Sequence, residues 1–332
     1  MTPYLAVFVP PVVLALAASF GGPWLALPPM VLFFAVPVLD QLLPVNRDNR
    51  AAAAWTRALP WAFLPVHVGA LGFALWTIGR GTLPVTEAML LALGAGTATA
   101  AAINVAHEAM HRSGRAEQAL GAVLMATATY THFCVEHVQG HHKRVGTPDD
   151  PASARLGESL YAFLPRSLWG GLVSAWHIER ARSGVGMRNR LVRYGLGQIV
   201  LLAAVVLAFG PLALAAFLLQ SAVAVLMLET INYVEHYGLS RAETAPGRFE
   251  RVRPEHSWNS CHRVSNWILL NLARHSDHHA FAARPFTDLR HYDDVPQLPA
   301  GYSAMLMLAT IPPLWSRVMD RRVLALKQAP SR

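Results

Sequence analysis

The residues most capable of chemistry in this chain are its histidines, nine of which fall into four clusters. Neutral imidazole is a common metal ligand, and the 332-residue sequence contains 15 histidines. The segments HEAMHR and EHVQGHH each contain a pair spaced four residues apart, which places both rings on one helix face. The segments NYVEHYGL and RHSDHHA contribute the others. The nine clustered histidines are His107, His111, His137, His141, His142, His236, His275, His278 and His279.

The number and type of these residues predict two metal ions. One zinc ion needs only three or four protein ligands, so nine rings indicate two ions. Ligation by nitrogen without thiolate suits iron, copper, nickel or zinc, and two open-shell ions favour oxygen chemistry. Only Cys134 and Cys261 could supply thiolate, and no CxxC motif occurs. A disulfide framework is therefore excluded.

Carboxylates next to the clusters are candidates for supporting the rings. A ligating histidine usually donates its second N–H to a carboxylate, which fixes the tautomer. Glu235 and Asp277 lie inside the motifs, so we expect both in this role. Asp149 and Asp150 fit this role and a solvated loop equally well. The other histidines are expected to be structural, with His132 at most behind a ligand: they are His67, His132, His177, His256, His262 and His291.

The composition indicates that these clusters belong to a membrane protein. Hydrophobic residues make up 53% of the chain and charged residues only 14%, against about 25% in a typical soluble domain. This argues against a soluble enzyme, a disordered chain or a nucleic-acid-binding protein. The net charge of +8 fits Lys and Arg retained on the inner face of a membrane, so we expect no nucleic-acid partner.

Six apolar stretches are long enough to cross a bilayer, which predicts an all-α polytopic fold with six transmembrane helices. The first lacks the basic start and the clean cleavage site of a signal peptide, so we expect it to remain a span. A seventh stretch, Leu120–Val135, lies between His111 and His137. If both bind one site, this stretch makes no net crossing. The predicted spans are residues 4–20, 23–43, 60–78, 84–104, 195–209 and 211–233.

Basic segments predict the orientation in the membrane. The loop 44–59, the long loop 143–193 and the tail 317–332 carry most of the Arg and Lys residues near the spans. The positive-inside rule then places these segments and both termini in the cytoplasm, as expected for an inner (cytoplasmic) membrane protein. We expect a single domain over 1–332, with a histidine-rich cytoplasmic cap formed by 105–194 and 234–332.

The four clusters closely resemble the motifs of the membrane alkane 1-monooxygenases, the integral-membrane di-iron alkane hydroxylases. HEAMHR resembles the family's first box, with Arg112 in place of lysine. EHVQGHHKRVGTPDDPASAR is nearly its second box, NYVEHYGL matches as it stands, and LARHSDHHA differs only at Ala273. The resemblance covers roughly 104–323. Xylene monooxygenases have similar boxes, and fatty acid desaturases and hydroxylases are more distant.

This resemblance implies two iron ions held by the nine clustered histidines, and O₂-dependent hydroxylation of a terminal methyl group of a medium- or long-chain alkane. It also implies electrons from rubredoxin, or a ferredoxin, with its reductase. Rubredoxin is small and acidic, which suits a basic cap. The missing paired CxxC motifs exclude a fused rubredoxin. The hydrocarbon substrate would reach the site from the lipid bilayer.

Other functions also fit part of the sequence. Xylene or aromatic methyl monooxygenation and fatty-acyl desaturation or hydroxylation need similar motifs. HEAMH alone matches the HExxH pattern of zinc proteases, in which Glu108 would be the general base. An intramembrane protease would, however, leave seven clustered histidines unused. A non-enzymatic metal carrier would need ionisable residues at mid-membrane, where only His67 is expected.

Overall fold

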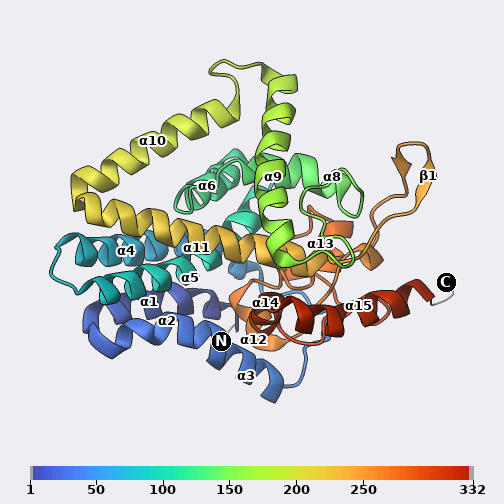
Figure 1. Cartoon of the computed structure of the whole chain (residues 1–332), viewed down its shortest axis with the longest axis horizontal. Coiled ribbons are helices and arrows are strands. Elements are labelled where there is room, and N and C mark those ends of the chain that lie inside the picture. The colour runs from blue at the N-terminus through green and yellow to red at the C-terminus, as the bar shows by residue number, and fades with distance from the viewer. Residues whose placement is uncertain (1–2, 329–332) are drawn as a thin grey trace.

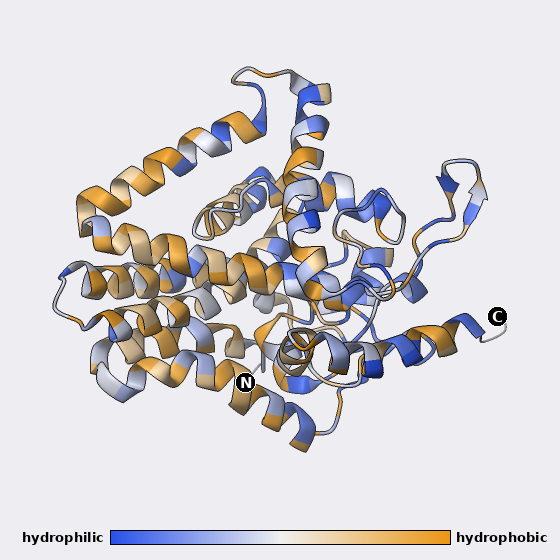
Figure 2. Cartoon of the chain, viewed as in Figure 1, coloured by the Kyte–Doolittle hydropathy of each residue, from blue (hydrophilic) through white to orange (hydrophobic). Residues whose placement is uncertain are grey.

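The computed structural model describes residues 3–328, which form a bundle of long helices joined at one end to a cap of shorter ones (Figure 1). Six helical segments are long and apolar enough to cross a membrane, as the sequence predicted. Figure 2 shows that hydrophobic residues dominate these helices and that polar residues gather in the cap. The six segments are Pro3–Phe20, Gly22–Leu42, Ala54–Gly79, Val85–Met110, Arg190–Phe209 and Pro211–His236.

Several of these segments are composite. The first joins η1 (Pro3–Phe8) to α1 (Val9–Phe20), and the third joins η4 (Ala54–Ala58) to α4 (Leu59–Gly79). The second runs through η2 (Gly22–Ala26), α2 (Leu27–Met30), η3 (Val31–Ala35) and α3 (Val36–Leu42). Prolines at the first turns of these pieces account for the changes of helix type, because proline lacks the N–H that continues a regular helix.

Two spans continue several residues past the C-terminal ends of the apolar stretches that predicted them. The helix α5 (Val85–Met110) extends six residues past the expected end, and α11 (Pro211–His236) extends three. The helical hydrogen bonds continue past the apolar stretches into the packed cap. Both extensions therefore carry a clustered histidine, His107 on α5 and His236 on α11. The apolar run therefore predicts where each helix lies in lipid but not where its last turn ends.

Small residues hold α5 at the centre of the bundle. A methyl group added to Gly96 would lie 2.5 Å from the Cβ atom of Val223 on α11, so the two backbones approach closely only because this residue is glycine. Gly94 packs on Pro28 in the same way, at 3.0 Å. Close packing through small residues is a common means of helix association in membranes, and here it fixes the helix that carries His107.

The chain between the fourth and fifth spans contains two helices that do not add a crossing. The helix α6 (Arg115–Ala126) has 12 residues, about 18 Å, which is too short to span a bilayer. This agrees with the predicted lack of a net crossing. The helix α9 (Leu160–Ser183) lies within the stretch that the sequence analysis treated as a loop. Arg and Glu side chains interrupt its apolar residues, so no uniform apolar run marked it.

The remaining short elements build the cap. They are α7 (Phe133–Val135), η5 (Glu136–His141), α8 (His142–Arg144), β1 (Glu243–Ala245), β2 (Arg248–Phe249), η6 (Pro254–His256), α12 (Arg263–Ile268), α13 (His275–Ala280), η7 (Phe286–Asp288), α14 (Tyr302–Ala309) and α15 (Pro312–Gln328). The strands β1 and β2 pair antiparallel in a small hairpin. The side chain of Asp40, at the end of α3, accepts hydrogen bonds from the N–H groups of Val264 and Ser265, so it fastens α12 to the bundle.

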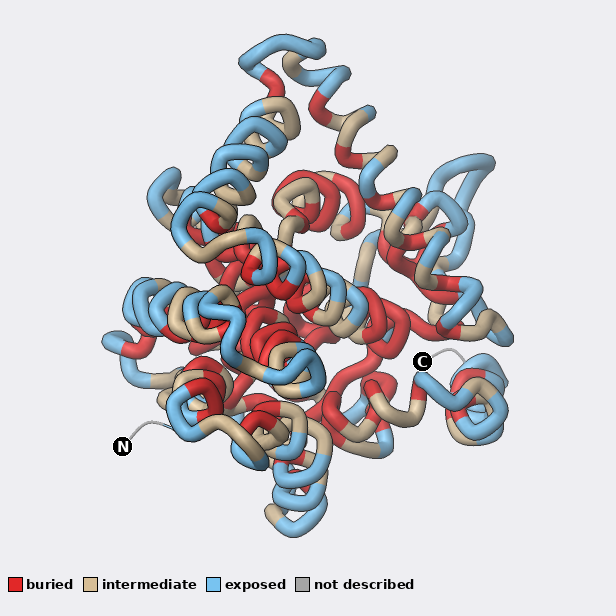
Figure 3. The backbone as a smooth tube through the Cα atoms, turned by 60° about the vertical axis from the view of Figure 1, so that its left-hand side comes forward, coloured by how far each residue is buried: buried red, intermediate tan, exposed pale blue. Residues whose placement is uncertain are grey.

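Burial differs strongly among the spans. Buried residues concentrate in α5 and in the cap, whereas the outward faces of the other spans are exposed (Figure 3). The helix α10 (Arg190–Phe209) is the extreme case, with Val205 as its one buried residue. Apolar side chains such as Val200 and Leu207 are 68% and 87% exposed on it. Contiguous exposed apolar surface of this kind on a helix long enough to span a bilayer faces lipid.

Candidate metal centre

The nine clustered histidines come from four regions and meet at one end of the bundle. His107 and His111 lie at the C-terminal end of α5, and His236 is the last residue of α11. The second cluster occupies η5 and α8, and the fourth occupies α13. Two long spans therefore supply three of the rings, and the cap supplies six.

Five of these rings form one group, with one nitrogen of each within 4.8 Å of the others. This five-histidine group consists of His107, His111, His137, His142 and His278. The Nε2 atom of His137 lies 2.7 Å from that of His107 and 3.0 Å from that of His142. Metal–nitrogen bonds of about 2.1 Å put two ligands of one ion about 3 Å apart. The spacing of these nitrogen atoms therefore suits a single metal ion between them.

The other four rings form a second group beside the first. His141, His236 and His279 have nitrogen atoms within 4.8 Å of one another, and so do His236, His275 and an oxygen of Glu235. His236 belongs to both sets, so they describe one four-histidine group: His141, His236, His275 and His279. The ring of His279, in the four-histidine group, stacks on the ring of His142, in the five-histidine group, with centroids 4.3 Å apart. The two groups are therefore in contact.

The local backbone decides which rings of the second cluster go to which group. Residues 136–141 form a π-helix, in which each turn contains more residues than an α-helical turn. His137 therefore faces the same group as His142, five residues later, and His141 faces the other group. The i, i+4 spacing predicted that His137 and His141 would share a helix face, whereas the structure divides this pair between the two groups.

Burial keeps the clustered rings other than His141 neutral and ready to bind a metal. It lowers the pKa of His142 and His278 well below the usual range for histidine. A metal ligand must be deprotonated, so this state favours ligation. Several fully enclosed ring nitrogens also have no hydrogen-bond partner among residues 3–328, including Nε2 of His111, His141 and His279. Buried polar atoms without partners are costly, and two bound metal ions would satisfy them. The site therefore fits the two ions that the sequence implies.

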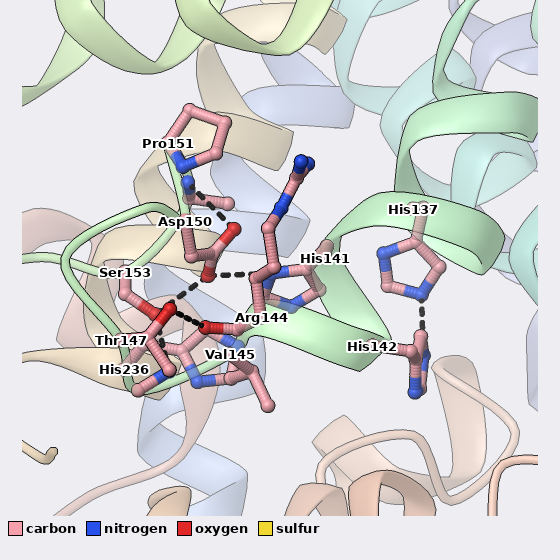
Figure 4. A network of polar contacts seen from close by, with 12 residues as sticks. His137, His141, His142, Arg144, Val145, Thr147, Asp150, Pro151, Ser153 and His236 are labelled. Atoms are coloured by element: carbon pink, nitrogen blue, oxygen red, sulfur yellow. Dashed lines mark hydrogen bonds and ion pairs between the residues drawn. The ribbon is translucent and has the colours of Figure 1, made fainter. Parts of the chain in front are cut away.

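Asp150 supports one ring from outside the centre. Its Oδ2 atom lies 2.9 Å from Nδ1 of His141 and 2.6 Å from the hydroxyl of Ser153 (Figure 4). Burial opposes protonation of His141, but the carboxylate of Asp150 outweighs this effect and raises the pKa of the ring. His141 in turn lowers the pKa of Asp150 despite its burial. The sequence left Asp150 undecided, and its tertiary contact gives it a supporting position.

The two expected carboxylates have different surroundings. Glu235 lies 3.1 Å from Nε2 of His275, the nitrogen that also faces His236, so it stands on the inner side of the ring. Tyr302 donates a hydrogen bond to its other oxygen. Asp277 instead accepts hydrogen bonds from Arg284 and from the hydroxyl of Tyr292.

The expected contact between Asp277 and a ligand ring is not among the hydrogen bonds of the described residues 3–328. The backbone N–H of Arg290 is its third donor, so this carboxylate ties α13 to the segment 284–292. Its position between two clustered histidines in the sequence gave no sign of this, because the partners come from a later segment.

The remaining histidines lie outside the two groups. His67 stacks on Phe63 and lies 3.2 Å from the hydroxyl of Thr127, in keeping with the structural role expected for it. His132 packs against Tyr130. Among the residues that the structure describes, none of the potential metal-binding groups includes the cap histidines His177, His256, His262 and His291.

Glu108 does not have the surroundings of a general base for zinc proteolysis. Its carboxylate accepts from Arg112 at 2.6 Å and lies 3.4 Å from the backbone N–H of Phe286. The contact with Phe286 ties α5 to the start of η7. The arrangement of HEAMH is therefore explained by the five-histidine group and by this ion pair.

An apolar cavity leads between the spans to the metal centre. Residues of α1, the second span, α5, α11, α12 and α14 line it, and His107, His137 and His275 lie at its inner end. On α5, Thr97, Ala100 and Asn104 line the wall below His107. Ten residues of helix separate Thr97 from His107, roughly 15 Å. The cavity therefore follows α5 for roughly 15 Å toward the histidines.

Comparisons with known proteins agree with this arrangement. The sequence model of the family described as fatty acid desaturase matches residues 82–308. Alkane 1-monooxygenase 2 of Pseudomonas aeruginosa is 41% identical over 91% of this chain and 84% of its own length. Alkane 1-monooxygenase 1 of the same organism is 44% identical over 87% of this chain and 80% of its own.

A more distant relative is the xylene/toluene monooxygenase hydroxylase component of Pseudomonas putida, at 26% identity over 89% of this chain and 81% of its own. The alkane 1-monooxygenases are more similar in sequence, and that similarity covers most of the length of each protein. The chain therefore belongs to the alkane 1-monooxygenase family of membrane oxidoreductases.

Proposed function

We propose that this protein uses O₂ to hydroxylate the terminal methyl group of a medium- or long-chain alkane, giving a primary alcohol. The observation that carries the proposal is the apolar cavity that ends at two adjacent histidine groups. The relatives named as alkane 1-monooxygenases support the same substrate class.

Two iron ions are the metals that best suit the centre, one in the five-histidine group and one in the four-histidine group. Nitrogen ligands without thiolate, with Glu235 on the inner side, suit iron in oxygen chemistry. When bound, the pair of irons would supply the activation of O₂ and the oxidation of the C–H bond. The protein supplies ligation through neutral rings and fixes His141 through Asp150.

The chain itself orients a substrate that has no polar group. The cavity wall is built from apolar side chains such as Val13, Leu32 and Ile268, so an alkane can be held by shape and by exclusion of water. An extended hydrocarbon advances about 1.3 Å per carbon, so the roughly 15 Å between Thr97 and His107 accommodates about 12 carbons. The terminal methyl group would then lie next to His107 and His137.

The side-chain amide of Asn104, in this wall, can form a hydrogen bond with the alcohol product. Both side-chain polar atoms of Asn104 are buried without a hydrogen-bond partner in the described part of the chain, and the residue lies one turn before His107. An alkane offers no hydrogen bond to this amide, but a primary alcohol does. Asn104 therefore favours the hydroxylated end of the product over the methyl end of the substrate.

The basic charge of the cap supports the proposed electron donor and the proposed side of the membrane. The basic segments around the cap favour a cytoplasmic position for the metal centre in an inner membrane. They also suit an acidic electron-donor protein such as rubredoxin, or a ferredoxin, supplied by its reductase.

The test is product analysis with the whole protein. Membranes would receive octane, hexadecane or p-xylene with ¹⁸O₂, rubredoxin and its reductase, and products would be identified by mass spectrometry. We expect 1-alkanols that carry one ¹⁸O atom. Benzylic alcohol alone would favour the aromatic alternative, and unsaturated acyl products would favour a desaturase.

Histidine variants link this activity to the metal centre. His141→Ala and His278→Ala should each abolish hydroxylation and lower bound iron while the protein still inserts into the membrane. His177→Ala is the matched control, because this exposed ring lies on α9 outside both groups. Full iron content and activity in both His141→Ala and His278→Ala would contradict the proposed centre.

A further inference from the structure

A second pocket lies beside the metal centre, where the end of α5 and residues next to His137 help to line it. It has a volume of about 830 Å³ and shares no lining residue with the substrate cavity. Its walls come from α6, α9 and the start of α10, and its floor from the end of α5 and from residues 134–139. Figure 1 shows the start of α10 away from the bundle and close to the end of α9.

Positive charge dominates the rim of this pocket. Its lining contains five arginines and one glutamate: Arg115, Arg182, Arg188, Arg190, Arg193 and Glu179. Five positive charges and one negative charge leave a net charge of +4. Glu179 pairs with Arg190 at 2.6 Å, and within residues 3–328 no ion pair involves the other four arginines. We refer to this feature as the arginine pocket.

The floor of the arginine pocket is apolar. Met110, Ala122, Cys134 and Val138 line it beneath the arginines. Val123 on α6 is 49% exposed, and Ile199 and Val200 on α10 are 64% and 68% exposed. The pocket therefore combines an anion-attracting rim with an apolar interior, next to a span whose surface faces lipid.

We propose that the arginine pocket binds an anionic phospholipid, with the phosphate at the arginines and the upper acyl chain along the apolar floor. Basic pockets between transmembrane helices are a known way to hold anionic headgroups. Arg188, Arg190 and Arg193 lie at the start of the fifth span, where a helix enters the headgroup region of a bilayer. A soluble acidic protein would match the charge but would not fill an apolar space between helices.

The position of the pocket gives the bound lipid a structural effect on the metal centre. Cys134 and Val138 flank His137 in the sequence, and Gln139, another lining residue, precedes His141 by two. The lipid would brace α6, α9 and α10, which otherwise contact one another weakly, against the segment that carries these rings. Anionic lipid should therefore stabilise the folded protein even when no substrate is turned over.

The experiment compares thermal unfolding of the full-length protein in phosphatidylcholine nanodiscs with and without phosphatidylglycerol. We expect phosphatidylglycerol to raise the Tm in a saturable manner. The variant Arg188→Gln/Arg193→Gln, in which both exposed arginines lose their charge, should lose at least half of this shift. The control Arg248→Gln/Arg251→Gln removes two exposed arginines near the β hairpin and should keep it.

Three further outcomes would overturn the proposal. An equal Tm shift in the two double variants would show that the lipid acts elsewhere. Reproduction of the shift by soluble glycerol 3-phosphate in phosphatidylcholine nanodiscs would identify a free phosphate as the ligand. An unchanged lipid shift with weaker binding of rubredoxin to Arg188→Gln/Arg193→Gln would instead identify a protein-docking surface. None of these measurements requires hydroxylase activity, so the result is independent of the proposed function.

Discussion

Replacing Asp150 with asparagine tests how the four-histidine group holds its metal. The Oδ2 atom of Asp150 accepts the Nδ1–H of His141 at 2.9 Å, and the side chain is completely buried. The substitution Asp150→Asn keeps an acceptor of the same shape but removes the negative charge that makes the opposite nitrogen of the ring a stronger ligand. Loss of such a supporting contact typically lowers metal affinity about 10- to 100-fold, or roughly 1.4–2.8 kcal/mol.

The structure makes this loss specific to one of the two proposed iron ions. His141 belongs to the four-histidine group, and the five-histidine group contains no ring bonded to Asp150. We therefore expect Asp150→Asn to release about half of its iron 10- to 100-fold faster than the unchanged protein. The other half should leave at nearly the original rate.

The assay mixes anaerobic, reduced, iron-loaded protein with an excess of a chromophoric iron chelator and follows colour formation over time. Asp149→Asn is the matched control, because the neighbouring carboxylate is exposed and the change in charge is the same. Equal release rates in the two variants would refute a supporting role for Asp150. Accelerated loss of all the iron would refute the division of the histidines into two groups.

Three other substitutions probe the cavity and the bundle. Ala100→Phe places a large ring about 10 Å from His107 along α5, so product analysis should show the longest accepted alkane falling from about 12 to about 8 carbons. The exposed control Met89→Phe should leave this length unchanged. An unchanged chain-length profile in Ala100→Phe would contradict the proposed substrate path. Asn104→Leu should weaken product inhibition by 1-octanol with little change in the KM for octane, and stronger inhibition would refute hydrogen bonding to the product. Gly96→Ala should destabilise the protein by about 1–3 kcal/mol in thermal unfolding, because the added methyl group overlaps a valine of α11. Gly69→Ala, with open space around it, should be neutral. Equal Tm values for the two variants would contradict the tight contact at Gly96.

The histidine pattern and the spans could be predicted from the sequence because both depend on local chemistry. Apolar stretches of about 20 residues must cross lipid as helices, since their backbone polar groups have no other partners there. The family motifs lie at the same ends of these spans, and the structure brings all nine clustered histidines together. The lack of a crossing in α6 also followed, because two clusters on one side of the membrane leave no alternative.

Only the tertiary structure decided which rings share a group and which carboxylates support them. An α-helical spacing pairs His137 with His141, but the π-helical turn between them sends these rings to different groups. Asp150 bonds to a ring and Asp277 to Arg284, whereas the sequence favoured Asp277 for the supporting role and left Asp150 undecided. Periodicity describes a segment whose geometry is regular, whereas these contacts join segments that meet only after the chain has packed.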